Sequence, residues 1–440
     1  MTTTSTPRVS CRSCGSDLTS DPRFVQWCPS CGWNANPGGN QAKGRTDRLL
    51  RKLNTQAEER LYRKVTADPS THRALSMARI GAFAMAGLVH LVTLALAVGG
   101  VWLLFYPSWV ARGLGVLALL LAVHQRPRLG PNRKARRSML TLDPAAAPRL
   151  YALTERVAAE LGTAAPSVIV VNGSYNASYL RTGARRRVML SLGLPLWEVL
   201  TPGQRLALLG HELGHGANGD SRQGLWVGTA LASLREWYYL FRPGRRMVVP
   251  GRGRASAQSG IASLGEMVAR ALLAVFAELT LLAHRVLTRL TLLSGRRAEY
   301  LADALSARVA GPDCTAELLQ ALTMGSVVEH VRQKRRMSTA SLPRSRRDSR
   351  GPDRRETKDL WTELREHLAS VPPSERARRL LVSQLDDSAV DSTHPPTHLR
   401  LTYVQQLPPS EPTVAVGADE VAAIENELAA ARTAIAHALS

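Results

Sequence analysis

The segment His211-Glu212-Leu213-Gly214-His215 decides how this chain is interpreted. On an α-helix, histidines four residues apart lie on one face, about 5–6 Å from each other, so both imidazoles can reach one ion. Glu212 lies between them and can contact a water at an open coordination position. The pattern predicts a zinc site with His211 and His215 as ligands and Glu212 as a general base for hydrolysis. The alternative is a pair of core histidines that are satisfied by hydrogen bonds.

The residues before this motif predict that it is helical. Thr201 suits the N-cap, Pro202 the first helical position, and Gln204 completes a capping box. Leucines then follow at a spacing that gives the helix an apolar face. Asp220 comes soon after the helix and is a candidate hydrogen-bond partner for a histidine ligand.

Two histidines leave a catalytic zinc one protein ligand short. The acidic residues after the helix that could supply it are Glu266, Glu278, Glu299 and Asp303. Glu299 and Asp303 are four residues apart, which would place a ligand and its partner on one helical face. Spacing alone does not choose among the four.

Four of the five cysteines form two pairs near the start of the chain, Cys11-x-x-Cys14 and Cys28-x-x-Cys31. This spacing predicts a structural zinc held by four thiolates, as in a zinc ribbon. Two disulfides are the alternative, but no secretory signal precedes the pairs, so we expect reduced thiols in the cytoplasm. Cys314 stands alone and is interpreted as an inert small residue.

The composition is strongly basic, with a formal net charge of +22 over 440 residues, and 45% of the residues are hydrophobic, enough for a sizeable core. The charge comes mostly from arginine. It indicates attraction to anionic lipid or nucleic acid, or it reflects a GC-rich genome, and both interpretations stay open.

Residues 79–124 predict a transmembrane hairpin, because apart from the two ends only His90 and Arg112 are ionisable and the length allows two spans of about 20 residues. The turn falls at Gly99-Gly100 or at Tyr106-Pro107-Ser108. Basic residues flank both ends, so the positive-inside rule predicts that both flanks face the cytoplasm.

Four segments, in order, resemble the HtpX and CAAX prenyl endopeptidase family of membrane zinc metallopeptidases of the gluzincin type, over about residues 75–405. They are Asn176-Ala177, His211 to His215, Arg297-Ala298-Glu299-Tyr300-Leu301-Ala302-Asp303 and Ser392-Thr393-His394-Pro395-Pro396. The resemblance implies a mainly α fold with a small antiparallel β-sheet.

The resemblance also implies roles for individual residues. Glu299 would be the third zinc ligand, Asp303 would orient a histidine ligand, and His394 would stabilise the tetrahedral oxyanion. Asn176 and Ala177 would bind the substrate backbone, with Asn176 in an edge strand. For His394 the alternative is a turn histidine beside two prolines. The family's usual aromatic residue after Asn-Ala is replaced by Ser178, which leaves substrate choice open.

We expect five regions along the chain. They are a zinc ribbon in 1–35, a basic linker and helix in 36–78, the transmembrane hairpin in 79–124, a metallopeptidase domain in 143–405, and a tail with a helix in 406–440. Within the metallopeptidase domain we expect a helix at 145–161, strands at 168–171, 175–180 and 188–192, two further apolar helices at 225–241 and 261–293, and a disordered insertion at 331–359. The two apolar helices are interpreted as membrane-associated or partly inserted, and two full crossings stay open as the alternative.

These patterns predict a multi-pass bacterial membrane protein that uses zinc to hydrolyse peptide bonds of membrane or misfolded proteins on the cytoplasmic side. Its partners would be protein or peptide substrates and the lipid bilayer. Nucleic acid is not expected, because no aromatic residues are interleaved with the arginines; the oligomeric state stays open. The alternative is a catalytically silent, membrane-anchored regulatory or nucleic-acid-binding protein that uses the ribbon and the basic surface. The intact Glu212 argues against it, since a scaffold has no need for a base.

Overall fold

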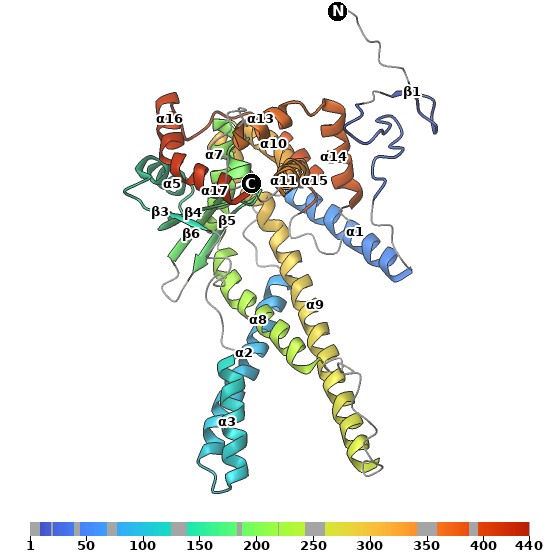
Figure 1. Ribbon diagram of the computed structural model, residues 1–440, viewed down its shortest axis with the longest axis vertical. Coiled ribbons are helices and arrows are strands. Elements are labelled where there is room, and N and C mark those ends of the chain that lie inside the picture. The colour runs from blue at the N-terminus through green and yellow to red at the C-terminus, as the bar shows by residue number, and fades with distance from the viewer. Residues whose placement is uncertain are drawn as a thin grey trace, which may run out of the picture. The chain divides into compact units, whose positions relative to one another are not determined.

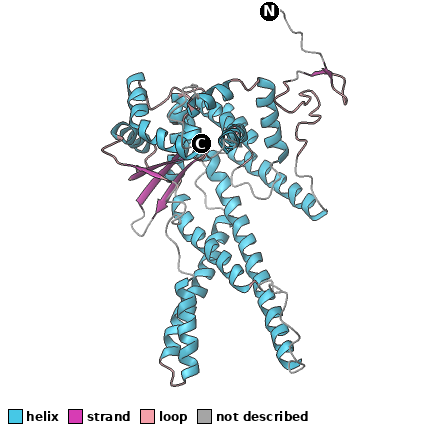
Figure 2. Cartoon of the chain, viewed as in Figure 1, coloured by secondary structure: helices cyan, strands magenta, loops and turns pink. Residues whose placement is uncertain are grey.

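The computed structural model describes most of the chain, mainly as helices with a few short strands (Figures 1 and 2). The described residues are 9–18, 21–38, 45–67, 77–124, 139–182, 187–218, 220–242, 260–340, 359–386 and 395–439. They divide into two compact units. Unit 1 comprises Met1–Ala74, Asn132–Ser221 and Gly295–Ser440, and unit 2 comprises Leu75–Pro131 and Arg222–Ser294.

Unit 1 contains a four-stranded sheet in the order β3-β4-β6-β5. The strands are β3 (Leu140–Leu142), β4 (Val168–Asn172), β5 (Ala177–Thr182) and β6 (Arg187–Gly193). Three of them were predicted, whereas β3 is too short to give a pattern. The predicted antiparallel sheet is wrong in one respect: β4 and β6 are parallel. Strand β6 returns between β4 and β5, so it pairs antiparallel with β5 and must run parallel to β4.

The helix that carries the histidine motif is α7 (Pro202–Ala217), and its predicted start is confirmed. The Thr201 Oγ1 accepts a hydrogen bond from the Gln204 backbone at 3.3 Å, and the Thr201 N–H donates to Gln204 Oε1 at 3.1 Å. The short helix α6 (Leu194–Trp197) links β6 to it. Arg205, which is buried, donates to the Trp197 carbonyl. The sheet and the capping box together fix where α7 begins.

Helix α9 (Gly260–Ala310) belongs to unit 1 from Gly295 onward, where it packs closely on α7. A Cβ on Gly210 would lie 3.1 Å from the Ser306 Cα, and one on Gly214 would lie 3.2 Å from the Ala302 Cα. The two glycines therefore let the backbones approach, and the Ser306 hydroxyl donates to the Ala207 carbonyl.

The predicted disordered insertion at 331–359 begins too early. Helix α10 (Pro312–Leu322) is followed by α11 (Gly325–Ala340), which is anchored by the buried Val331. Helix α13 (Leu360–Ala369) then begins with Asp359 as its N-cap. Val331 is buried and Arg335 pairs with Glu363 of α13, and these two contacts attach the basic end of α11 to the rest of unit 1. Residues 341–358 lie outside the described part of the chain.

The remaining helices of unit 1 include the tail, which joins the core. They are α1 (Arg45–Ala67), α5 (Pro148–Glu160), α14 (Pro373–Asp386), α15 (Thr397–Gln405), α16 (Ala418–Glu427) and α17 (Ala429–Leu439). Ile424, Leu428 and Ile435 are buried in the main hydrophobic cluster. The tail therefore forms two helices that close the core.

Unit 2 is helical and apolar. It contains α2 (Met77–Leu104), α3 (Trp109–His124), most of α8 (Asp220–Phe241) and the first part of α9. The turn between α2 and α3 falls at the second of the two predicted places. Among the described residues, two helices are long and apolar enough to cross a membrane, Met77–Leu104 and Met267–Ala310, and Trp109–Val123 is a shorter apolar helix. Many large apolar side chains on these helices are exposed.

Candidate metal centres

Helices α7 and α9 bring His211, His215 and Glu299 together. One ligand atom of each lies within 4.8 Å of the others. The Nε2 of His211 is 3.5 Å from Glu299 Oε2, and the Nε2 of His215 is 3.6 Å from Glu299 Oε1. Of the acidic candidates whose side chains are described, Glu299 is the one that forms a metal-ligand group with both histidines. The side chain of Glu266 lies outside the described part, and Glu278 belongs to unit 2.

The donor atoms fit a zinc ion. Two imidazole nitrogens and one carboxylate form a ligand set that catalytic zinc takes in peptidases. Ligands about 2 Å from zinc at tetrahedral angles lie roughly 3.3 Å apart, close to the distances seen here. His211 and Glu299 are buried and His215 is half-buried, so an ion here would be screened from water on most sides.

Behind His211 lies a buried network of opposite charges. The Asp303 Oδ1 is 3.0 Å from His211 Nδ1, which would fix the ring with its Nε2 toward the ligand Glu299. Arg400 of α15 donates two hydrogen bonds to Asp303, from Nη2 to Oδ1 at 2.7 Å and from Nε to Oδ2 at 2.8 Å. Its Nη1 is 3.4 Å from Glu299 Oε2. Arg400 therefore balances both carboxylates.

Arg400 was missed in the sequence. It follows the Ser-Thr-His-Pro-Pro segment and is the sole lysine or arginine of the short helix Thr397–Gln405. A lone arginine between leucines on such a helix indicates a buried cation that needs an acidic partner. Its partner Asp303 is 97 residues away, and sequence pattern alone does not specify so distant a pairing.

The charges around His211 change its affinity for protons. Burial acts to lower the pKa of His211, but hydrogen bonds with Asp303 and Glu299 outweigh it and raise the pKa to about 10 in the metal-free protein. A metal ion must displace this proton to bind the ring nitrogen that faces Glu299.

Three other predicted site residues lie on α7 and at the start of β5. Glu212 is on α7 between the two histidines, and only 8% of its surface is exposed. Asn176 is exposed immediately before β5, and Ala177 is the buried first residue of that strand. Strand β5 is an edge of the described sheet and packs on α7, where a Cβ on Gly216 would meet the Tyr179 ring at 2.7 Å.

Two predictions fall outside what the structure describes. His394 lies outside the described residues, which resume at Pro395. The backbone of Asp220 begins α8, but its side chain is not described. The proposed roles of these two residues therefore stay predictions.

The four paired cysteines form a second group of metal-ligand type. The Sγ atoms of Cys11 and Cys31 are 3.7 Å apart, and those of Cys14 and Cys28 are 3.5 Å apart. Thiolates about 2.3 Å from a tetrahedral zinc lie roughly 3.8 Å apart, so the group fits zinc, whereas a disulfide needs about 2 Å. Hydrogen bonding with Ser16 lowers the pKa of Cys14 to about 6, which favours the thiolate that binds metal.

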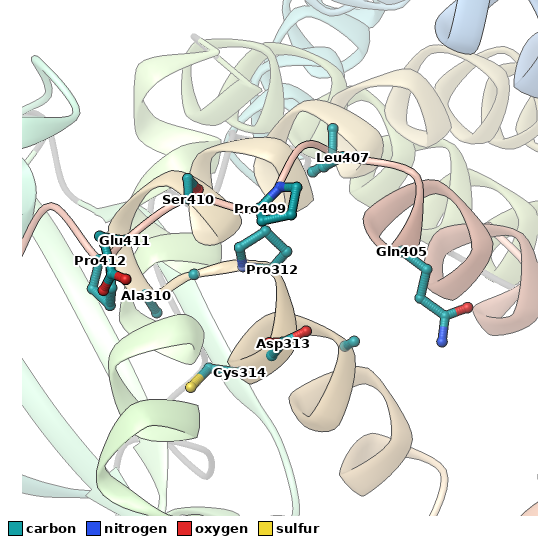
Figure 3. Close-up of a pocket in the computed structure, with 12 residues that line it drawn as sticks. Ala310, Pro312, Asp313, Cys314, Gln405, Leu407, Pro409, Ser410, Glu411 and Pro412 are labelled. Atoms are coloured by element: carbon teal, nitrogen blue, oxygen red, sulfur yellow. The ribbon is translucent and has the colours of Figure 1, made fainter.

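A cavity of about 560 Å³ lies elsewhere in unit 1, at the junction of α9 and α10 and along residues 405–412 (Figure 3). None of the metal-ligand residues lines it. Cys314 does, and burial together with Glu317 and Asp313 raises the pKa of its thiol. A thiol that stays protonated is a poor nucleophile, in agreement with an inert role.

The comparisons with known proteins agree with this geometry. Residues 144–407, more than half of the chain, match the model of peptidase family M48. A protein described as a protease HtpX homolog, from Syntrophobacter fumaroxidans (strain DSM 10017 / MPOB), is 28% identical over 194 residues. The alignment covers 42% of this chain and 62% of that protein, less than two thirds of its length. The matched residues contain the histidines, Glu299, Asp303 and Arg400, and on this evidence the chain belongs to peptidase family M48.

Proposed function

We propose that the chain is a membrane-anchored zinc metalloendopeptidase. The observation that carries the proposal is the placement of Glu299 beside both His211 and His215, with Glu212 kept between the histidines. Family membership and the two candidate membrane spans support it. The proposed substrates are peptide segments of membrane or misfolded proteins on the cytoplasmic side.

In the proposed mechanism His211, His215 and Glu299 hold the ion. Bound zinc would polarise the scissile carbonyl and lower the pKa of a bound water toward about 7. Glu212 would act as the general base that accepts a proton from the attacking water and would donate it to the leaving amine. Asp303 keeps His211 in the tautomer whose Nε2 is free to bind metal, and Arg400 keeps Asp303 in place.

The proposed substrate site is the free edge of β5. An extended peptide would pair with the backbone there, beginning at Asn176 and Ala177, because an edge strand presents unpaired N–H and C=O groups. The packing of β5 on α7 supports this, since it places the edge near the histidine helix. His394 is proposed as the oxyanion donor, from the resemblance of its Ser-Thr-His-Pro-Pro context.

The four cysteines are proposed to hold a second, structural zinc. This group contains thiolates alone and so offers no carboxylate to act as a base. A role in hydrolysis is therefore assigned to the histidine group.

Replacing Glu212 by Gln tests the function, because it removes the base but keeps the size of the side chain. We expect hydrolysis of a casein-like or misfolded membrane substrate by the full chain in detergent to fall by about 10²- to 10⁴-fold, with both zinc ions retained. The control is Glu155→Gln, at an exposed position of α5, which should change nothing. Full proteolysis by Glu212→Gln would contradict the proposal and leave the silent regulatory protein as the alternative.

A further inference from the structure

Helix α1 packs on α9 beside Glu299, and a buried ion pair joins the two helices. Glu58 of α1 pairs with Arg296 of α9, and only 4% and 5% of these side chains are exposed. Because a buried charge is costly unless it is paired, this contact fixes α1 to α9 at one point. Arg296 precedes Glu299 by three residues, so the pair lies within one helical turn of the ligand.

The contact continues through Tyr300, which directly follows the ligand and is completely buried. The ring of Tyr62 on α1 lies 6.2 Å from that of Tyr300, and Val65, also completely buried, belongs to the same cluster. Tyr403 of α15 contacts Tyr300 edge-on at 5.5 Å. Tyr300 is thus held by side chains from α1 and α15.

These contacts leave α9 little freedom to rotate around Glu299. On a helical wheel Asp303 lies about 40° from Glu299 and faces the histidine network, whereas Tyr300 lies about 100° away on the adjoining flank. Helix α7 packs through Gly214 against the side of α9 that faces the histidine network. Helix α1 packs against the adjoining side, where Tyr300 lies. A rotation of α9 that moved the carboxylate would have to break the contacts of α1.

We propose that α1 is a positioning element for the histidine–glutamate group. By docking through Glu58, Tyr62 and Val65 it holds the Glu299 carboxylate where both histidines share an ion with it. The metal affinity of this group therefore depends on a helix that supplies none of its ligands. This inference rests on the metal site of the proposed function.

Cobalt(II) binding by the full chain in detergent tests the inference. Cobalt bound by thiolates has charge-transfer absorption that cobalt bound by imidazole and carboxylate lacks, so the two groups are measured separately in one sample. We expect Glu58→Ala to weaken binding at the histidine–glutamate group about tenfold, at the lower end of what loss of outer contacts costs a metal site. Tyr62→Ala should weaken it less. Binding by the cysteines should not change in either variant.

Two further variants give the controls. Glu59→Ala removes the neighbouring carboxylate on the exposed face of α1 and should leave both affinities as they are. Glu58→Gln keeps an acceptor for Arg296 and should recover part of the loss, which a general loss of helix would not allow. Unchanged affinity in Glu58→Ala would overturn the inference, as would equal weakening of both metal groups. If Glu58→Ala does not fold, the same two cobalt affinities are compared in Tyr62→Ala, which changes a partly exposed side chain. Unchanged affinity at the histidine–glutamate group in that variant would overturn the inference.

The test of α1 and the test of the proposed function can fail independently of each other. Cobalt affinity is measured without any substrate. A wild-type chain that binds cobalt at the histidine–glutamate group but hydrolyses no peptide would contradict the peptidase proposal and leave the role of α1 intact. An active wild-type enzyme together with wild-type cobalt affinity in both Glu58→Ala and Tyr62→Ala would contradict the role of α1 and leave the peptidase proposal intact.

Discussion

The two candidate metal centres are built in opposite ways. The cysteine group comes from turns, with Cys11 and Cys31 only 20 residues apart and with Cys14 and Cys31 exposed. The histidine–glutamate group comes from two long helices, and its network reaches from His211 to Arg400, 189 residues away. The first centre is local and needs little else to form. The second exists only when distant helices pack and when its buried charges balance.

Removing one ligand from each centre tests this contrast and should have the largest effect. We expect the wild type to bind two zinc ions and both His215→Ala and Cys28→Ser to bind one. His215→Ala should lose hydrolysis completely, because the zinc site loses a ligand. Cys28→Ser should keep hydrolysis within about threefold, since α1 docks through its own contacts. Zinc content by elemental analysis and a peptide-cleavage assay check this, and loss of both ions from one variant would show that the centres are not independent.

Arg400 offers the next test, because it should affect one centre alone. Arg400→Ala removes two hydrogen bonds from the buried Asp303 and a nearby positive charge from Glu299, which we expect to cost about 3–5 kcal/mol of folding stability. Arg400→Lys keeps the charge but not the paired hydrogen bonds to Asp303, so it should lose less. Thermal unfolding of the full chain in detergent measures both. The control is Arg60→Ala on the exposed face of α1, and an equal loss there would contradict the role of the network.

The smallest effect is expected from pH. The pKa of His211 in the folded, metal-free protein is raised to about 10, above the unfolded value of about 6.5. The protonated ring thus stabilises the fold fully below about pH 6.5, and this contribution disappears as the pH rises through about 10. We expect the metal-free Tm to fall by a few degrees between pH 7 and pH 10. The fall should shrink in Asp303→Asn, and an unchanged fall in that variant would contradict the assignment.

Local patterns predicted the parts of the molecule that local forces build. The capping box at Thr201 and Gln204, the strands near 168–192 and the helices of the apolar hairpin were each present in short stretches of sequence. The two histidines could be recognised as metal ligands from the sequence because one helix carries both. Glu299 was one of four candidates until the family resemblance favoured it, and the structure places it at ligand distance.

What the sequence did not predict depends on distant packing. The parallel pairing of β4 and β6 is set by where β6 returns in the sheet, and β3 has only three residues. Residues 331–340 have a disorder-like composition, yet they form the end of α11, where Val331 is buried and Arg335 pairs with Glu363. Arg400 and the Glu58–Arg296 pair join elements far apart in the chain, and no short window of sequence contains both partners.

The distance between Asp303 and Arg400 also has a consequence for the growing chain. Asp303 leaves the ribosome 97 residues before Arg400, its hydrogen-bond donor. At 5–20 residues per second this delay is roughly 5 to 20 s. During that time Asp303 lacks both of its hydrogen bonds from Arg400, so we expect the network behind His211 to be completed only after α15 has been synthesised. The proposed peptidase would then become active only after most of its own chain has been made.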